Sequence, residues 1–197
     1  VIYPAGQKEA SISVRNTSET SRFMVQSWVE DKNGEKTSDF IVTPPLYVSN
    51  PGSENTLRLM YAGPALSPDR ETLFYLTAKA IPAVDKSETA GKNVLMLSAA
   101  TRIKLFVRPA GLKPSPADAV SKLTFSRNGL VVTVSNPTPY YITLTDMKAG
   151  SQALKDSVMV PPVGTKTFSL PAGQAGALSY RTINDYGGLT DERIWRF

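Results

Sequence analysis

The chain has 197 residues, 41% of them hydrophobic as in a globular protein, and contains neither histidine nor cysteine. The lack of cysteine excludes disulfides, thiol nucleophiles and thiolate metal sites, and the lack of histidine excludes a Ser-His-Asp triad and His-ligated zinc. A net charge of +5 comes from scattered Lys and Arg residues without a basic block, which argues against nucleic-acid binding. No apolar run reaches the roughly 18 residues of a membrane span. With no nucleophile elbow and no phosphate-binding loop, we expect a protein that is not an enzyme.

Alternation of apolar and polar residues predicts β-strands along the first half of the chain. These strands are expected at residues 10–14, 23–29, 56–61, 72–80 and 93–107. The pair Asn33-Gly34 is a turn signal after the second of them. No segment repeats apolar residues with the period of a long amphipathic helix, so the sequence predicts an all-β fold.

Proline and glycine at 108–111 end this first series, and a second series follows. Its strands are expected at residues 123–126, 130–134, 140–145, 165–170 and 177–183. Asn128-Gly129 is the signal for a hairpin between the first two. Two such series predict two immunoglobulin-like β-sandwich domains, at residues 1–110 and 111–197. The aromatic residues expected to fill their cores are Trp28, Tyr75 and Tyr180.

The expected strand at 93–107 is long, and its first nine residues carry no charge. Val94 and Met96 would lie on one face, and Leu95, Leu97 and Ala99 on the other. An exposed edge of this kind is an aggregation hazard. Two interpretations remain open: a central strand buried on both faces, or an edge strand that pairs with another chain by β-augmentation.

Short motifs along nearly the whole chain resemble one protein family. They are Val1-Ile2-Tyr3-Pro4-Ala5-Gly6, Val42-Thr43-Pro44-Pro45, Asp69-Arg70-Glu71-Thr72-Leu73-Phe74-Tyr75, Ile81-Pro82, Arg102-Ile103-Lys104-Leu105-Phe106-Val107-Arg108-Pro109, Asn136-Pro137-Thr138-Pro139-Tyr140-Tyr141 and Ile183-Asn184-Asp185-Tyr186-Gly187-Gly188. In this order and spacing they resemble the PapD-like periplasmic pilus chaperones, close to the type 1 fimbrial branch.

The resemblance implies two immunoglobulin-like domains in an L or boomerang arrangement, located in the periplasm after removal of a signal peptide. It implies a chaperone that binds, folds and caps pilus subunits by donating the last strand of its first domain, about 93–107, to a subunit that lacks one. Subunits are then delivered to an outer-membrane usher. Neither a metal nor another cofactor is implied. Self-association of the free form through the same strand is a further possibility.

Two groups of subunit-binding residues follow from the resemblance. Lys104 matches the family lysine that binds the C-terminal carboxylate of the subunit, and the arginine that pairs with it is expected immediately before Val1. The residues that match the hydrophobic binding strand are Leu95, Leu97, Ala99 and Ile103. Lys104 has the opposite parity to these residues, which requires either a bulge or strong twist between them or a separate recognition face.

A buried charged cluster is also implied by the resemblance. Its members are Glu71, Arg108 and Asp185, which in the family fix the two domains relative to each other. One guanidinium between two carboxylates can satisfy several donors in a fixed geometry.

Two alternatives to a chaperone agree less well with the sequence. A pilus subunit or adhesin would be shorter, with a donor extension at its N-terminus and usually a disulfide, whereas this chain has two strand series and no cysteine. A generic immunoglobulin-like binding module would not explain Lys104 together with the charged cluster.

Overall fold

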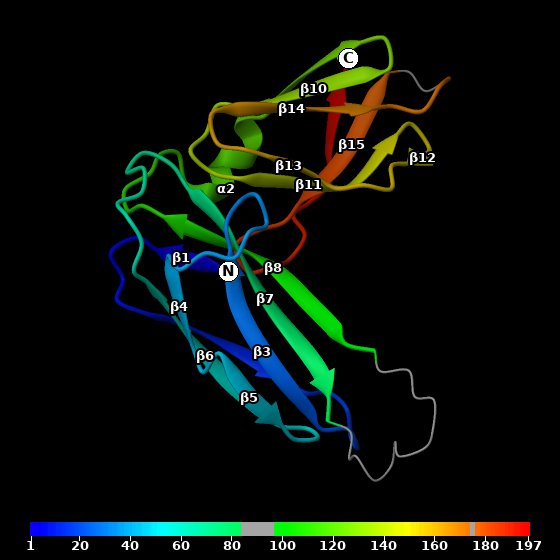
Figure 1. Ribbon diagram of the computed structural model, residues 1–197. Coiled ribbons are helices and arrows are strands. Elements are labelled where there is room, and N and C mark those ends of the chain that lie inside the picture. The colour runs from blue at the N-terminus through cyan, green and yellow to red at the C-terminus, as the bar shows by residue number, and fades with distance from the viewer. Residues whose placement is uncertain (84–96, 174–175) are drawn as a thin grey trace. The chain divides into compact units, whose positions relative to one another are not determined.

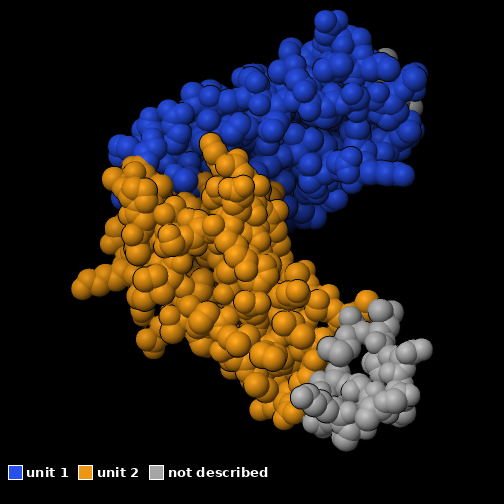
Figure 2. All heavy atoms as spheres, in the orientation of Figure 1, with its two compact units in different colours: residues 1–2, 67–72, 108–197 blue, residues 3–66, 73–107 orange. Residues whose placement is uncertain are grey.

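The computed structural model describes residues 1–83, 97–173 and 176–197 (Figure 1). The chain forms two compact units (Figure 2). Unit 1 consists of Val1–Ile2, Ser67–Thr72 and Arg108–Phe197, and unit 2 consists of Tyr3–Leu66 and Leu73–Val107. The segment Ser67–Thr72 therefore belongs with the C-terminal half of the chain, although the sequence analysis counts it in the first domain. The division into domains at residue 110 stays a prediction.

The first half of the chain forms two sheets. The larger has the order β1-β8-β7-β3-β5, with strands β1 (Ile2–Pro4), β8 (Ala99–Arg108), β7 (Thr72–Pro82), β3 (Phe23–Glu30) and β5 (Leu46–Ser49). The smaller has the order β2-β6-β4, with strands β2 (Ala10–Arg15), β6 (Glu54–Tyr61) and β4 (Phe40–Thr43). The strands expected before residue 83 are confirmed as β2, β3, β6 and β7, whereas β1, β4 and β5 are additional.

The core of unit 2 follows from the alternation along β3. Val25 and Val29 are buried, and they lie opposite Ala80 and Leu76 of the antiparallel strand β7. Phe40 of β4 contacts Phe74 of β7 edge-on, with ring centroids 5.1 Å apart. Since β4 and β7 belong to different sheets, these contacts join the two sheets as a sandwich.

The expectation that Trp28 and Tyr75 fill the core is wrong. Both are only partly buried. Because Val29 points into the core, its neighbours Trp28 and Glu30 point outward. Tyr75 lies directly opposite Glu30 on the same outward face. Each aromatic ring there is covered by a cation instead of by core residues.

Unit 1 contains the second pair of sheets. One has the order β14-β10-β9, with strands β9 (Thr124–Asn128), β10 (Val131–Asn136) and β14 (Gly164–Ser169). The other has the order β12-β11-β15-β16, and β13 also pairs with β11; its strands are β11 (Ile142–Ala149), β12 (Gln152–Ala153), β13 (Val158–Val160), β15 (Ala177–Thr182) and β16 (Arg193–Arg196). The expected hairpin is confirmed: Asn128 pairs with Val131, and Gly129 has φ = 59°.

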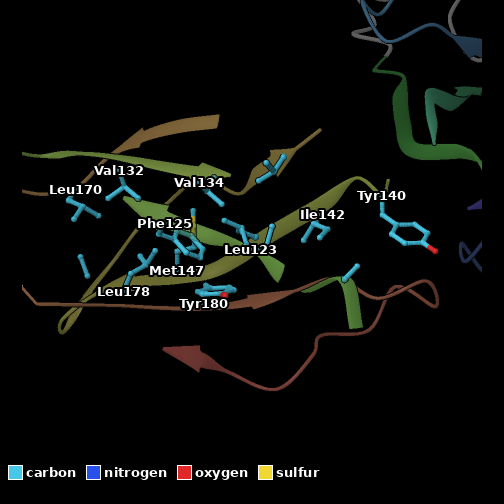
Figure 3. Packing of buried hydrophobic residues seen from close by; sticks show 14 residues of the cluster. Leu123, Phe125, Val132, Val134, Tyr140, Ile142, Met147, Leu170, Leu178 and Tyr180 are labelled. Atoms are coloured by element: carbon cyan, nitrogen blue, oxygen red, sulfur yellow. The ribbon is translucent and has the colours of Figure 1, made fainter. Parts of the chain in front are cut away.

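Buried side chains from both of these sheets meet in the core of unit 1 (Figure 3). The rings of Phe125 on β9 and Tyr180 on β15 lie 5.1 Å apart, and Trp195 of β16 lies 5.3 Å from Phe125. The expectation that Tyr180 is a core residue is confirmed, and the two sheets pack as a second sandwich.

Helical structure is minor. Helix α2 (Pro116–Ala119) is followed by the 3-10 turn η1 (Val120–Lys122). Ser115 caps α2 by accepting a hydrogen bond from the backbone N–H of Asp118 at 3.2 Å. Across the described ranges, no helix has the length and apolar character needed to cross a membrane.

Candidate functional site

The strand expected to bind a partner is found as β8, with a later start. Leu97 and Ser98 precede it as irregular chain, and the strand begins at Ala99. Leu97 is 73% exposed. Leu95 lies outside the described residues. From Ala99 to Arg102 every residue is exposed, so the interpretation as a strand buried on both faces is wrong for this part.

The position of β8 in the sheet leaves much of one backbone edge uncovered. On one side lies β7, with eleven residues, and on the other lies β1, with three. A three-residue strand cannot pair with all ten residues of β8. Within the described part of the chain, most of the outer edge of β8 is therefore available for main-chain hydrogen bonds to a further strand.

One face of β8 lines a hollow between the two sheets of unit 2. Ala99, Thr101 and Ile103 border a cavity of about 480 Å³, and Ile12 and Val14 of β2 border it from the other sheet. The spacing of two along β8 is that of residues on one face of a strand. Ala99 and Ile103, both expected to bind a subunit, thus share the inward face, and Ala99 is the more exposed of the two.

Lys104 lies on the opposite face of β8. The strand is continuous from Ala99 to Arg108, and the cavity-lining residues on either side of Arg102 leave Arg102 and Lys104 directed outward. This favours a separate recognition face over a bulge between Lys104 and the apolar residues. Lys104 is half-buried, and burial lowers the pKa of its ammonium group.

Arg108, the last residue of β8, is held between the two carboxylates expected from the sequence. Its Nε donates to Glu71 Oε1 at 2.7 Å, and its two Nη groups donate to the Asp185 oxygens at 2.6 and 2.7 Å. The Arg108 side chain is 17% exposed, against 1% for Glu71 and 35% for Asp185. The three residues all belong to unit 1. The guanidinium thus makes a bidentate pair with Asp185 and a third charge-assisted bond with Glu71.

Glu71 is fixed from more than one direction. Its Oε2 accepts the backbone N–H of Tyr141 at 2.8 Å, and its own N–H donates to the Pro139 carbonyl at 2.9 Å. Burial raises the pKa of Glu71, although the bonds from Tyr141 and Arg108 act in the opposite direction. For Arg108, burial acts to lower the pKa, but the bonds to Asp185 and Glu71 outweigh it and the pKa is raised. The cluster therefore keeps Arg108 charged.

A second network, which the sequence analysis missed, lies on the outward face of β8. Arg102 Nε donates to Glu30 Oε2 at 2.7 Å, and the Arg102 guanidinium lies 3.8 Å from the centre of the Tyr75 ring. The available signal was the alternation of basic residues at 102 and 104, which places both side chains on one face of the strand.

The described residues contain no group of three or more acidic side chains arranged to hold a metal ion, in a chain that lacks His and Cys. The geometry suits a binding surface: a strand edge that β1 covers only in part, exposed apolar side chains and a half-buried lysine.

Two protein-domain families match almost the entire chain. Residues 1–113 match the pili and flagellar-assembly chaperone PapD N-terminal domain, and residues 118–194 match the C-terminal domain of the pili assembly chaperone PapD. The probable fimbrial chaperone SfmC of Escherichia coli (strain K12) is 47% identical over 193 residues, which cover 98% of this chain and 84% of SfmC. The chaperone protein FimC of the same strain is 48% identical over 191 residues, which cover 96% of this chain and 78% of FimC.

Solved structures agree with the sequence relatives. The periplasmic chaperone SfaE matches with a TM-score of 0.84 and 42% identity, covering 98% of this chain and 94% of the SfaE chain. A chain in the complex of the Salmonella enterica SafA pilin with the SafB chaperone matches with a TM-score of 0.89 and 31% identity, covering 100% of this chain and 92% of the other. The chain belongs to the family of PapD-like pilus-assembly chaperones.

Proposed function

We propose that this chaperone works in the periplasm and binds pilus subunits by donating β8 to complete their fold. The observation that carries the proposal is the exposed first half of β8, from Ala99 to Arg102, beside an edge that the short strand β1 covers only in part. A strand of a partner that adds to this edge would gain main-chain hydrogen bonds, and alternate side chains would set its register. The names of SfaE, a periplasmic chaperone, and of the SafA–SafB complex support the proposal.

The hydrophobic part of the interaction is assigned to the residues around the start of β8. Leu97 and Ala99 have the same parity as Ile103, so a strand that extends through them presents all three on one side. Leu95, which lies outside the described residues, belongs to the same series. Burying an exposed leucine contributes about 1.5–3 kcal/mol, which makes Leu97 the largest described contributor.

The polar part of the interaction is assigned to Lys104 and the C-terminal carboxylate of the subunit. Burial lowers the pKa of Lys104 in the free protein, because its charge is partly removed from water. A bound carboxylate would raise that pKa again, and a charge-assisted bond contributes about 1.5–3 kcal/mol. Because Lys104 faces away from the cavity-lining residues, it would bind the C-terminal carboxylate of the subunit on the face of β8 opposite to the apolar side chains.

Two further parts of the proposal concern the charged cluster and the outer-membrane usher. Glu71, Arg108 and Asp185 are proposed to fix the geometry of the two predicted domains, 1–110 and 111–197. Delivery of the bound subunit to an outer-membrane usher is proposed from family membership. In this proposal the chaperone binds and releases the subunit without forming a covalent bond. Self-association of the free chaperone through β8 would compete with subunit binding.

Dilution of denatured pilus subunits, the SafA pilin among them, into buffer with and without the chaperone tests the proposal. We expect a soluble one-to-one complex on size-exclusion chromatography. Lys104→Ala and Leu97→Asp should each abolish or strongly weaken it. The matched controls Lys79→Ala, a partly buried lysine on β7, and Leu130→Asp, an exposed leucine of unit 1, should leave it intact. A complex that survives both test substitutions contradicts strand donation.

A further inference from the structure

The side chain of Arg102 links the exposed half of β8 to other strands of its sheet. The guanidinium pairs with Glu30 of β3 at 2.7 Å and stacks on Tyr75 of β7 at 3.8 Å. The turn after β3 also reaches it, since a Cβ added at Gly34 would lie 3.1 Å from Arg102 Nη2. One side chain of β8 therefore contacts both β7 and β3 and lies close to the turn after β3.

Glu30 is held in place for this contact. Its Oε1 accepts from Trp28 Nε1 at 2.8 Å and from Thr77 Oγ1 at 3.3 Å, which leaves Oε2 for Arg102. The Trp28 ring is in turn covered by the ammonium group of Lys36, 4.4 Å from the ring centre. The Glu30 side chain is only 13% exposed, so its pair with Arg102 is less screened than a surface ion pair.

The inward face of the same stretch offers little anchoring. Ala99 and Thr101 are exposed and border the cavity of about 480 Å³, so they lack the close packing of core residues. The first residue of β8 that is fully buried is Leu105. Between Ala99 and Leu105, Arg102 ties the outward face of β8 to the sheet through an ion pair with Glu30 and a cation–π contact with Tyr75.

We propose that Arg102 is a positioning residue for subunit binding, an inference that depends on strand donation by β8. Anchored from its outward face by Glu30 and Tyr75, the segment Ala99–Thr101 stays extended beside β7 while its inward side chains and its outer edge remain free for the subunit. An aliphatic anchor on the inward face would hold the strand equally well, but it would occupy the surface that the subunit has to contact.

Hydrogen–deuterium exchange of the free protein tests the anchor without any partner. In Arg102→Ala we expect protection of the amides of Ala99–Ile103 that face β7 to fall roughly threefold to tenfold, with little change in β6, the central strand of the other sheet. Arg102→Lys should fall between the two, because it keeps the charge opposite Glu30 but not the planar stacking on Tyr75. The control Arg58→Ala removes an exposed arginine from β6 and should change nothing in β8.

A double-mutant cycle with Glu30→Gln adds a second, independent criterion. If the pair anchors β8, the exchange effect of Arg102→Ala should shrink in the Glu30→Gln background. Equal exchange at Ala99–Ile103 in wild type and Arg102→Ala overturns the proposal. Uniform loss of protection through unit 2 also overturns it, because that would show a general stability effect. Arg102→Lys keeps the test valid if Arg102→Ala does not fold.

A binding assay with the same denatured pilus subunits, SafA among them, then tests whether the anchor matters for subunit binding. We expect Arg102→Ala to slow complex formation and lower affinity, Arg102→Lys to restore part of both, and Arg58→Ala to match wild type. Altered exchange with unaltered subunit binding would overturn the positioning role. If the wild type bound no subunit, strand donation would fail, whereas the exchange result would still decide whether Arg102 anchors β8.

Discussion

The two halves of β8 differ in their exposure to solvent and in the contacts that hold their side chains. From Ala99 to Arg102 the residues are exposed, whereas Leu105 is 0% and Val107 is 2% exposed. The second half ends in Arg108, whose guanidinium is bound by two carboxylates, while the first half is held by one half-exposed arginine. A single strand is thus a core element at one end and, in the proposed function, a binding element at the other. Most of the apolar burial of β8 therefore comes from its second half, while its first half contributes little to the core.

The largest expected effect comes from Arg108→Ala, at the end of the well-packed half. It leaves the buried Glu71 carboxylate without its cation, and removing one member of a buried pair typically costs about 3–5 kcal/mol. Urea unfolding followed by Trp195 fluorescence in a Trp28→Phe background reports on unit 1, which contains the cluster. Arg196→Ala, an exposed arginine of β16, is the control and should cost little.

The loss of stability in Arg108→Ala should depend on pH. The pKa of Glu71 is raised in the folded protein, so the folded state binds the proton more tightly and this group's contribution to stability falls as pH rises from 4.5 through the raised value. Arg108 lowers the pKa of Glu71, so its removal should extend this window upward. The loss of stability in Arg108→Ala should therefore be smaller at pH 5 than at pH 7. An equal loss at both pH values would argue against an ionised, unpaired Glu71.

A pair of leucine truncations compares the two halves directly. Leu105→Ala should lower the free energy of unfolding by about 2–5 kcal/mol, because it opens a cavity beside a fully buried position. Leu97→Ala should change it by less than about 0.5 kcal/mol, since Leu97 is 73% exposed. Trp28 fluorescence in a Trp195→Phe background follows unit 2. Equal losses for the two variants would contradict the division of β8 into a core half and a binding half.

Lys104→Met is also expected to have a small effect on stability. Replacing a half-buried ammonium by an apolar chain of similar length should change the free energy of unfolding at pH 7 by less than about 1 kcal/mol. Subunit binding should nevertheless fall, which separates the carboxylate anchor from the fold. Urea unfolding at pH 7, beside the subunit-refolding assay, measures both.

Lys104 also has a pH signature with a definite sign. Its pKa is lowered by burial in the folded protein, so the unfolded chain binds the proton more tightly. The contribution of Lys104 to stability therefore rises with pH between the lowered value and the ordinary lysine value of 10.5. Lys104→Met should lose this rise, and its persistence in the variant would assign the rise to another group.

Alternation was a sound guide to strands but a poor guide to which face is buried. The predicted strands of β2, β3, β6 and β7 are confirmed, yet Trp28 and Tyr75 lie on the outward face. The segment around Trp28 has apolar residues at both parities, so local sequence does not decide its direction. The strands β4 and β5 were missed because they are four residues each and are separated only by Pro44-Pro45, which indicate a turn.

By itself, the sequence determined the all-β class, most of the strands, the hairpin at Asn128-Gly129 and, through its motifs, the family. These features depend on local periodicity, turn chemistry and residue order, which are properties of the sequence itself. Only the tertiary structure decided that Arg102 meets Glu30 and Tyr75, and that Glu71 is bound by Tyr141, 70 positions away along the chain. Such contacts depend on strand order and register, which are set by the packing of whole sheets.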